Sequence, residues 1–166
     1  KYLVIYDDGF NYLTKMCLTV MREACFRMIA LGKENGCTVI VCSSDATDHY
    51  TEYLSSGADY IIQGEGELTL VELIDTLDKN ESAAILAGIV YKKQSAESEP
   101  IQVNPKRAVL QHLDQLPMPA WDLVDMNAYK VIWATSGQKF TLNIATTRGC
   151  PYKCNWCAKP IYGNRY

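Results

Sequence analysis

The stretch that decides the fold is Thr38-Val-Ile-Val-Cys42-Ser43-Ser44-Asp45, a short apolar run that gives way abruptly to polar residues. Such a run is typical of a strand that is covered on both faces of a parallel sheet. Similar runs lie on either side of it, at Tyr2–Tyr6 and at residues 59–63. Residues 2–91 therefore alternate strand-like and helix-like segments, which predicts an α/β fold with a parallel sheet.

Three helices are expected, two between these strands and one after the third strand. Apolar residues recur at helical spacing over residues 13–31, and Gly32 and Gly36 are the signals that end the pattern. Thr47 is suited to cap a short second helix. Thr69 and Glu72 have the spacing of a capping box at the start of the third helix.

Open α/β sheets bind ligands beyond the carboxyl ends of their strands, so the informative loops are residues 7–11, 42–47 and 64–67. The last of these is the run Gly64-Glu65-Gly66-Glu67. Its glycines permit close approach by a ligand or by other backbone. The same run also fits a plain strand-to-helix turn with acidic residues at a helix N-terminus, where the helix dipole favours them.

A second informative stretch is Cys150-Pro-Tyr-Lys-Cys154-Asn-Trp-Cys157, in which three thiols stand at C-x3-C-x2-C spacing. A structural zinc site takes four ligands, and no fourth Cys follows in the sequence. Three thiolates leave one position open, as an iron-sulfur cluster requires when it binds a small molecule at its unique iron. A zinc knuckle completed by His or by a distant Cys remains the alternative.

The string from Thr147 to Cys157 resembles the cluster loop of radical S-adenosylmethionine (SAM) enzymes, including the aromatic residue before the third Cys. The resemblance implies that Cys150, Cys154 and Cys157 hold a 4Fe-4S cluster whose free iron is chelated by SAM. One-electron reduction then cleaves SAM to a 5'-deoxyadenosyl radical. Trp156 would lie near the adenine. A small-molecule substrate and a reductant such as flavodoxin or ferredoxin are implied as partners.

Residues 1–82 resemble the later half of the flavodoxin-like or Rossmann-like cobalamin-binding domain that precedes the barrel in many of these enzymes. The resemblance implies cobalamin as a further cofactor, with contacts from residues of two loops: Ser43, Ser44, Gly64, Glu65 and Gly66. Cys42 and Ser43 replace the glycine pair that often admits the nucleotide tail of cobalamin. The Asp-x-His-x-x-Gly signature of cobalamin ligation is absent. We therefore expect no protein His on the metal.

Three segments are expected along the chain. Residues 1–82 form a partial cobalamin-binding-type α/β domain, and residues 83–139 form a β-hairpin followed by a Pro-rich interdomain linker. Residues 140–166 begin a radical SAM (β/α), or TIM, barrel, with a first strand at residues 140–144 ahead of the cluster loop.

The first residue is Lys1 and the last is Tyr166, and we expect the chain to be an internal piece of a longer enzyme. The remaining strands of the barrel would lie elsewhere in that enzyme. The piece itself is expected to fold around residues 2–91 and not to cleave SAM. Residues 150–166 are expected to be poorly ordered or held by a neighbouring molecule.

Composition and charge argue against two classes of function, nucleic-acid binding and membrane spanning. The 16 basic and 19 acidic side chains give a net charge of -3 without a basic run, which argues against nucleic acid as a partner. No apolar stretch approaches the ~20 residues of a membrane helix. Seven Cys without a signal peptide indicate reduced thiols and a cytoplasmic protein.

The resemblance implies an enzyme that methylates a carbon centre or carries out an oxidative cyclisation or rearrangement. The family includes methyltransferases acting on unactivated carbon and anaerobic porphyrin-ring cyclases. Two alternatives stay open: a radical SAM enzyme without cobalamin, and a structural module whose cysteines hold zinc.

Overall fold

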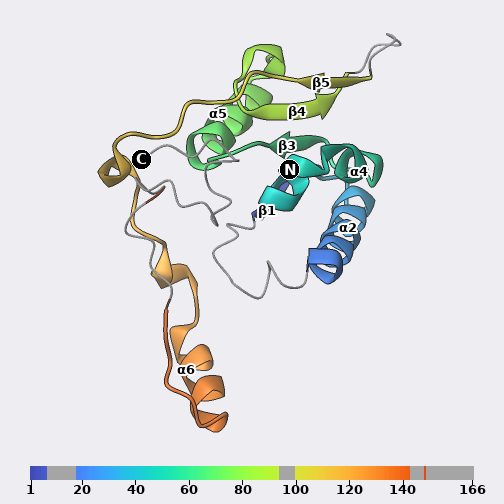
Figure 1. Cartoon of the computed structure of the whole chain (residues 1–166). Coiled ribbons are helices and arrows are strands. Elements are labelled where there is room, and N and C mark those ends of the chain that lie inside the picture. The colour runs from blue at the N-terminus through green and yellow to red at the C-terminus, as the bar shows by residue number, and fades with distance from the viewer. Residues whose placement is uncertain (7–17, 94–99, 143–147, 149–166) are drawn as a thin grey trace, which may run out of the picture. The chain divides into compact units, whose positions relative to one another are not determined.

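The computed structural model describes residues 1–6, 18–93, 100–142 and 148. The chain divides into two units, residues 1–109 and 110–166. The first unit contains an open five-stranded sheet with the strands in sequence order (Figure 1). The strands are β1 (Tyr2–Tyr6), β2 (Thr38–Cys42), β3 (Tyr60–Ile62), β4 (Ile89–Lys92) and β5 (Ile101–Val103). The first three pair in parallel and the last two are antiparallel, so the predicted α/β class is confirmed with a mixed sheet.

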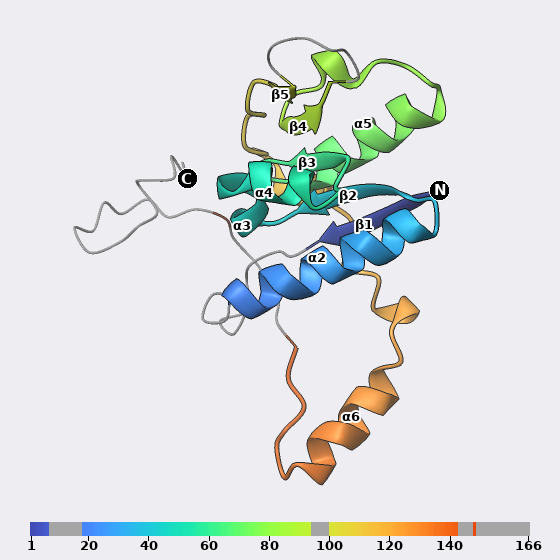
Figure 2. The ribbon, with the colours of Figure 1, turned by 90° about the vertical axis from the view of Figure 1, so that its right-hand side faces the viewer.

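The two faces of the sheet carry separate apolar clusters because side chains alternate along each strand. Val39 and Val41 of β2 pack on the side of α2 (Leu18–Glu34), α3 (Ser44–Asp48) and α4 (Tyr50–Ser55). Ile40 and Cys42 pack on the other side, under α5 (Glu67–Asp78) and the 3-10 helix η1 (Ala83–Ile85). Figure 2 shows helices on both sides of the sheet. Strand β2 is therefore covered on both faces, as its uninterrupted apolar run predicts.

The prediction that Gly32 ends a helix is wrong, because α2 continues to Glu34. A Cβ at Gly32 would lie 2.6 Å from Leu3 Cδ2 and 2.9 Å from Val39 Cγ2. The glycine thus lets the helix pack closely on β1 and β2. The other predicted stop signal, Gly36, is confirmed: it follows the helix with a left-handed φ of +67°.

The two predicted helix caps are also wrong. Thr47 was expected to cap the helix that carries Tyr53 and Leu54, which is α4, but Thr47 lies inside α3 and His49 is at the N-cap position of α4. Ser43 caps α3: its Oγ accepts a hydrogen bond of 2.9 Å from the Ala46 backbone N–H. Helix α5 begins at Glu67, with Gly66 at the N-cap position, so Thr69 lies inside the helix and is fully buried.

The predicted hairpin is confirmed as β4 and β5, and it belongs to the same sheet as the parallel strands because β4 pairs with β3. Asn104, directly after β5, is 3% exposed. Its Nδ2 donates to the backbone oxygens of Leu86 and Ala83, at 2.7 and 3.2 Å. These bonds fix the end of the hairpin to the segment that precedes β4.

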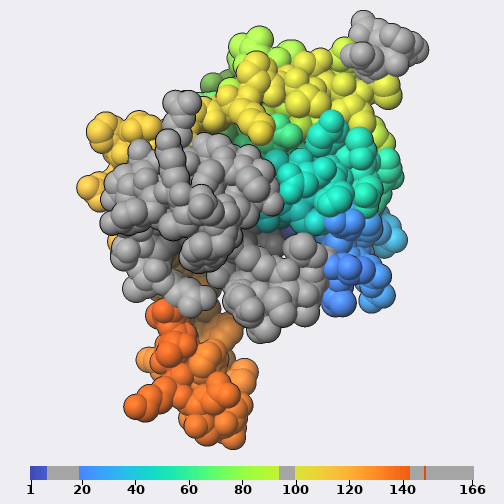
Figure 3. Space-filling view, in the orientation of Figure 1, coloured from blue at the N-terminus to red at the C-terminus, as the bar shows by residue number. Residues whose placement is uncertain are grey.

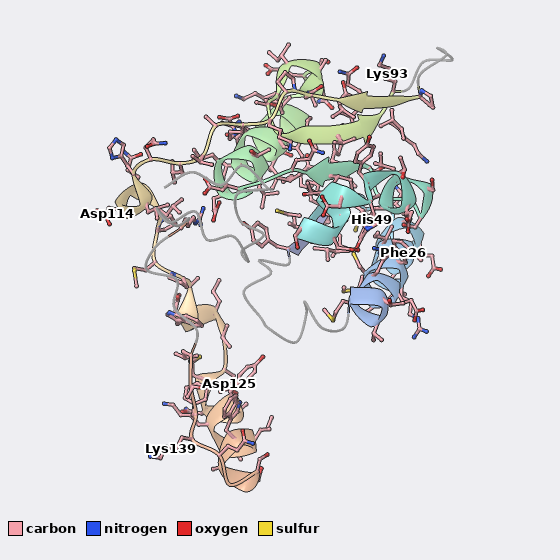
Figure 4. The ribbon with its side chains drawn as sticks, in the orientation of Figure 1. Phe26, His49, Lys93, Asp114, Asp125 and Lys139 are labelled. Atoms are coloured by element: carbon pink, nitrogen blue, oxygen red, sulfur yellow. The ribbon has the colours of Figure 1, made fainter. Side chains whose placement is uncertain are left out.

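The second unit contains η2 (Leu113–Gln115), η3 (Trp121–Leu123) and one helix that the sequence reasoning missed, α6 (Met126–Thr135). Asp125, labelled in Figure 4, caps α6 by accepting from the backbone N–H groups of Asn127 and Ala128. An Asp directly before a helical apolar pattern was the available signal. Phe140 packs edge-on against Trp133 at 6.3 Å between ring centroids.

The strand predicted at residues 140–144 is described only in part. Residues 140–142 are in no strand, and residues 143 and 144 lie outside the described residues. In the part of the chain that the structure covers, none of the helices is both long enough and apolar enough to cross a membrane.

Candidate ligand site at the carboxyl edge of the sheet

The ends of β1 and β2 meet the turn before α5. A Cβ at Gly66 would lie 2.7 Å from Cys42 Sγ and 2.8 Å from Tyr6 Cε2. A side chain at this position has no room, so only Gly lets the first turn of α5 approach the two strand ends. The structure therefore brings two of the three expected loops, residues 42–47 and 64–67, to one edge. Residues 7–11 lie outside the described residues.

Gly64 differs from Gly66 in its surroundings. Its φ is +80°, and among the described residues no heavy atom lies within 4 Å of the place where a Cβ would stand. The turn thus needs Gly at position 64 for its backbone conformation, while the space beside it is open. Of the two glycines, Gly66 serves internal packing and Gly64 borders the accessible side of the turn. Glu65 between them is partly buried.

Gln63, at the end of β3, is a site residue that the sequence reasoning missed. It is 7% exposed, and no donor reaches its Oε1 within the described structure. A buried acceptor without a hydrogen bond costs about 1–3 kcal/mol. Ile61, two residues earlier, packs on the α2, α3 and α4 side, and the alternation of a strand places Gln63 on that side too. A polar residue that ends an apolar strand just before a Gly-rich turn was the signal.

The two serines predicted to contact cobalamin differ in their hydrogen bonding. Ser43 is used locally: besides capping α3 through Oγ, its carbonyl accepts from the Thr47 N–H at 3.1 Å and from Thr47 Oγ1 at 2.9 Å. Ser44 is the exposed first residue of α3. Ser43 therefore shapes the loop, and Ser44 presents its side chain to solvent.

The loop after β2 is held by a carboxylate that the sequence reasoning did not single out. Asp45 accepts two 2.7 Å hydrogen bonds from Arg22 Nε and Nη2, and a 2.6 Å bond from the Tyr53 hydroxyl. The hydrogen bonds from Arg22 lower the pKa of Asp45, although its burial acts in the opposite direction. Burial, followed by the bond to Asp45, raises the pKa of Tyr53. At neutral pH the network is an ion pair with a neutral phenol.

Aromatic packing supports this network. Phe26 of α2 meets the Tyr53 ring edge-on at 5.1 Å between centroids. Phe26 and the exposed His49 are both labelled in Figure 4, on α2 and between α3 and α4. In the space-filling view, the α3–α4 segment lies at the surface between α2 and the hairpin (Figure 3). The loop after β2 is therefore rigidly attached to its neighbours.

The predicted metal and SAM residues, Cys150, Cys154, Cys157 and Trp156, lie outside the described residues. In the described ranges, no group of three or more His, Cys, Asp or Glu side chains is arranged to hold a metal ion.

No model of a known protein family matches the chain. The chain is similar to an uncharacterised methyltransferase of Pyrococcus horikoshii, with 35% identity over 109 residues, 65% of this chain and 22% of that protein. It is 30% identical over 122 residues to the anaerobic magnesium-protoporphyrin IX monomethyl ester cyclase of Synechocystis sp., covering 72% of this chain and 23% of that protein. An uncharacterised methyltransferase of Synechocystis sp. is 26% identical over 140 residues, 84% of this chain and 21% of that protein. The chain thus spans about a fifth of the length of these curated relatives, which are named as methyltransferases and a cyclase.

Proposed function

We propose that the protein is part of a radical SAM enzyme that transfers a methyl group or performs an oxidative cyclisation. The observation that carries the proposal is the three-thiol motif of Cys150, Cys154 and Cys157 in a chain similar to proteins named as methyltransferases and as a cyclase. Three thiolates on one short loop supply the ligands of a 4Fe-4S cluster and leave one iron for another ligand.

In this proposal each residue of the motif has one role. The three thiolates hold the cluster, and Trp156 covers the adenine of SAM. With SAM on its open iron and one electron from a reductant such as flavodoxin or ferredoxin, such a cluster would supply the chemistry that cleaves SAM to methionine and a 5'-deoxyadenosyl radical, which can take a hydrogen atom from a substrate. The alternative is zinc, which the same thiolates would bind together with a fourth ligand from another residue.

Cobalamin is the second proposed cofactor, bound beyond the carboxyl ends of β2 and β3. Two observations support a fit: the open space beside Gly64, and the buried Oε1 of Gln63, which lacks a donor. The amide side chains of a corrin ring carry N–H groups, the kind of donor that such an acceptor needs. Ser44, Gly64 and Glu65 would contact the ligand, whereas Ser43 and Gly66 would act by shaping the two loops. Bound cobalamin supplies a methyl carrier.

The cobalamin site is tested by titrating the full-length protein with hydroxocobalamin under anaerobic conditions and following its visible absorption. We expect saturable binding by the wild type. Gly64→Leu should weaken binding, because it places a side chain in the open space beside the turn. Leu at a left-handed φ is also strained, so the loss of cobalamin affinity has to be compared with the change in the free energy of unfolding. Absence of uptake by the wild type would contradict the cobalamin site and leave the radical SAM enzyme without cobalamin.

A further inference from the structure

The turn at residues 64–67 is tied at both ends to residues 105–107, near the end of the first unit, whose last residue is Val109. On the C-terminal side of the turn, Arg107 Nε donates a 2.8 Å hydrogen bond to Thr69 Oγ1. The guanidinium also forms an ion pair with Glu72, one helical turn further along α5. Thr69 is fully buried, so its hydroxyl has no access to water in place of Arg107.

On the N-terminal side of the turn the link runs through Gly88. The Gln63 N–H donates to the Gly88 oxygen at 2.8 Å, and the Gly88 N–H donates to the Pro105 oxygen at 2.7 Å. Gly88 has φ of +80°, and a Cβ there would lie 3.3 Å from Arg107 Cβ, 3.3 Å from Thr69 Oγ1 and 3.4 Å from the Gln63 oxygen. The residues before and after the turn therefore converge on the same segment.

We infer that Arg107 is a positioning residue that couples the turn at residues 64–67 to the segment that leads into the second unit. Its hydrogen bond and ion pair fix the first turn of α5, and with it the position of Gly64 and Glu65. Because coupling is reciprocal, a ligand that orders the turn also orders residues 104–109. The ligand half of this inference rests on the proposed function; the fixing of the turn does not.

Amide hydrogen exchange, measured peptide by peptide, tests without any ligand whether Arg107 fixes the turn. Arg107→Met should raise exchange in residues 64–72 by about tenfold, since a hydrogen-bonded charged group is lost, while exchange in α2 stays unchanged. Lys106→Met is the matched control, because Lys106 is the exposed neighbour of Arg107. Thr69→Val, which keeps the buried shape, should raise exchange in the same residues and serves if Arg107→Met does not fold. Unchanged exchange at residues 64–72 in both variants, or an equal rise in α2, would overturn the inference.

The coupling between a bound ligand and residues 104–109 is tested by adding hydroxocobalamin. In the wild type and in Lys106→Met, the ligand should slow exchange at residues 64–72 and also at residues 104–109. In Arg107→Met the effect on residues 104–109 should be clearly smaller even at saturation, because only the backbone link through Gly88 remains. If saturated wild-type protein shows slower exchange only at residues 64–72, the coupling is wrong. If no hydroxocobalamin binds, the cobalamin site and the ligand half fail together, and the exchange of the free variants still decides whether Arg107 fixes the turn.

Discussion

The carboxylate of Asp45 is held by both Nε and Nη2 of Arg22 at 2.7 Å, which joins α2 to the loop after β2. The Asp45 side chain is 10% exposed and the Arg22 side chain is 24% exposed, so the pair is largely shielded from water. Because this loop is one of the two that border the candidate ligand site, the pair determines how rigidly that site is presented.

Replacing Arg22 with Met should destabilise the protein by about 3 kcal/mol, because Asp45 is left buried without its main partner. Urea unfolding measures the change. Arg27→Met is the control, since Arg27 is an exposed residue of the same helix, and it should change the free energy of unfolding by no more than about 0.5 kcal/mol. Equal effects of the two substitutions would show that the pair does not stabilise the fold.

The Asp45 pair should also make stability depend on acid. Its folded-state pKa is lowered below the ordinary value, so the stabilisation is complete above that value, near pH 4, and is lost as the pH falls through the folded-state pKa. The difference in unfolding free energy between wild type and Asp45→Asn should be constant from about pH 5 to pH 7 and should shrink below about pH 4. A difference that is the same at pH 3 and at pH 7 would contradict the ionised pair.

The two glycines of the turn should respond differently to substitution. Gly66→Ala forces a Cβ against Cys42 Sγ and Tyr6, with an overpacking cost of about 1–3 kcal/mol. Gly64→Ala meets no neighbour and carries only the cost of its left-handed φ, about 1–2 kcal/mol.

Cys42→Ala separates these causes, because it removes the sulfur that Gly66→Ala would strike. In a double-mutant cycle, Cys42→Ala should relieve part of the cost of Gly66→Ala and none of the cost of Gly64→Ala. Strict additivity in both cycles would show that Gly66 and Cys42 are not packed as described.

Strands β1, β2 and β3 were predictable from sequence because each is an apolar run that is followed by polar residues. The start of α5 was not, since it depends on tertiary contacts: Gly66 is chosen by the strand ends it touches, and Thr69 by its bond to Arg107. Helix α6 was hidden by the prolines before it, although Asp125 is a good cap.

The candidate site was predictable only as a set of loops. Sheet topology brings residues 42–47 and 64–67 together, and glycine content marks the second loop. The partners that fix these loops are far away in sequence, 23 residues for Arg22 and Asp45 and 38 residues for Arg107 and Thr69. No periodicity or spacing rule relates such pairs, so only the fold identifies them.

Gln63→Met should separate stability from binding. The substitution removes a buried acceptor that has no donor, so the free protein should become more stable by about 1 kcal/mol. If Gln63 accepts a hydrogen bond from bound cobalamin, the same variant should bind hydroxocobalamin about tenfold more weakly. Unfolding experiments and absorption titrations measure the two effects. A variant that is less stable than wild type, or one that binds as well, would contradict the role given to Oε1.

The central claim is that Cys150, Cys154 and Cys157 hold a 4Fe-4S cluster with one open iron. The most direct measurement is iron, sulfide and zinc analysis of the anaerobically reconstituted full-length protein, with EPR spectra of the reduced protein before and after SAM is added. The account predicts about four irons and four sulfides per chain and an EPR signal that changes with SAM. It also predicts loss of the cluster when any one of the three Cys is replaced by Ala. One zinc per chain without sulfide, or full cluster content in all three variants, would contradict it.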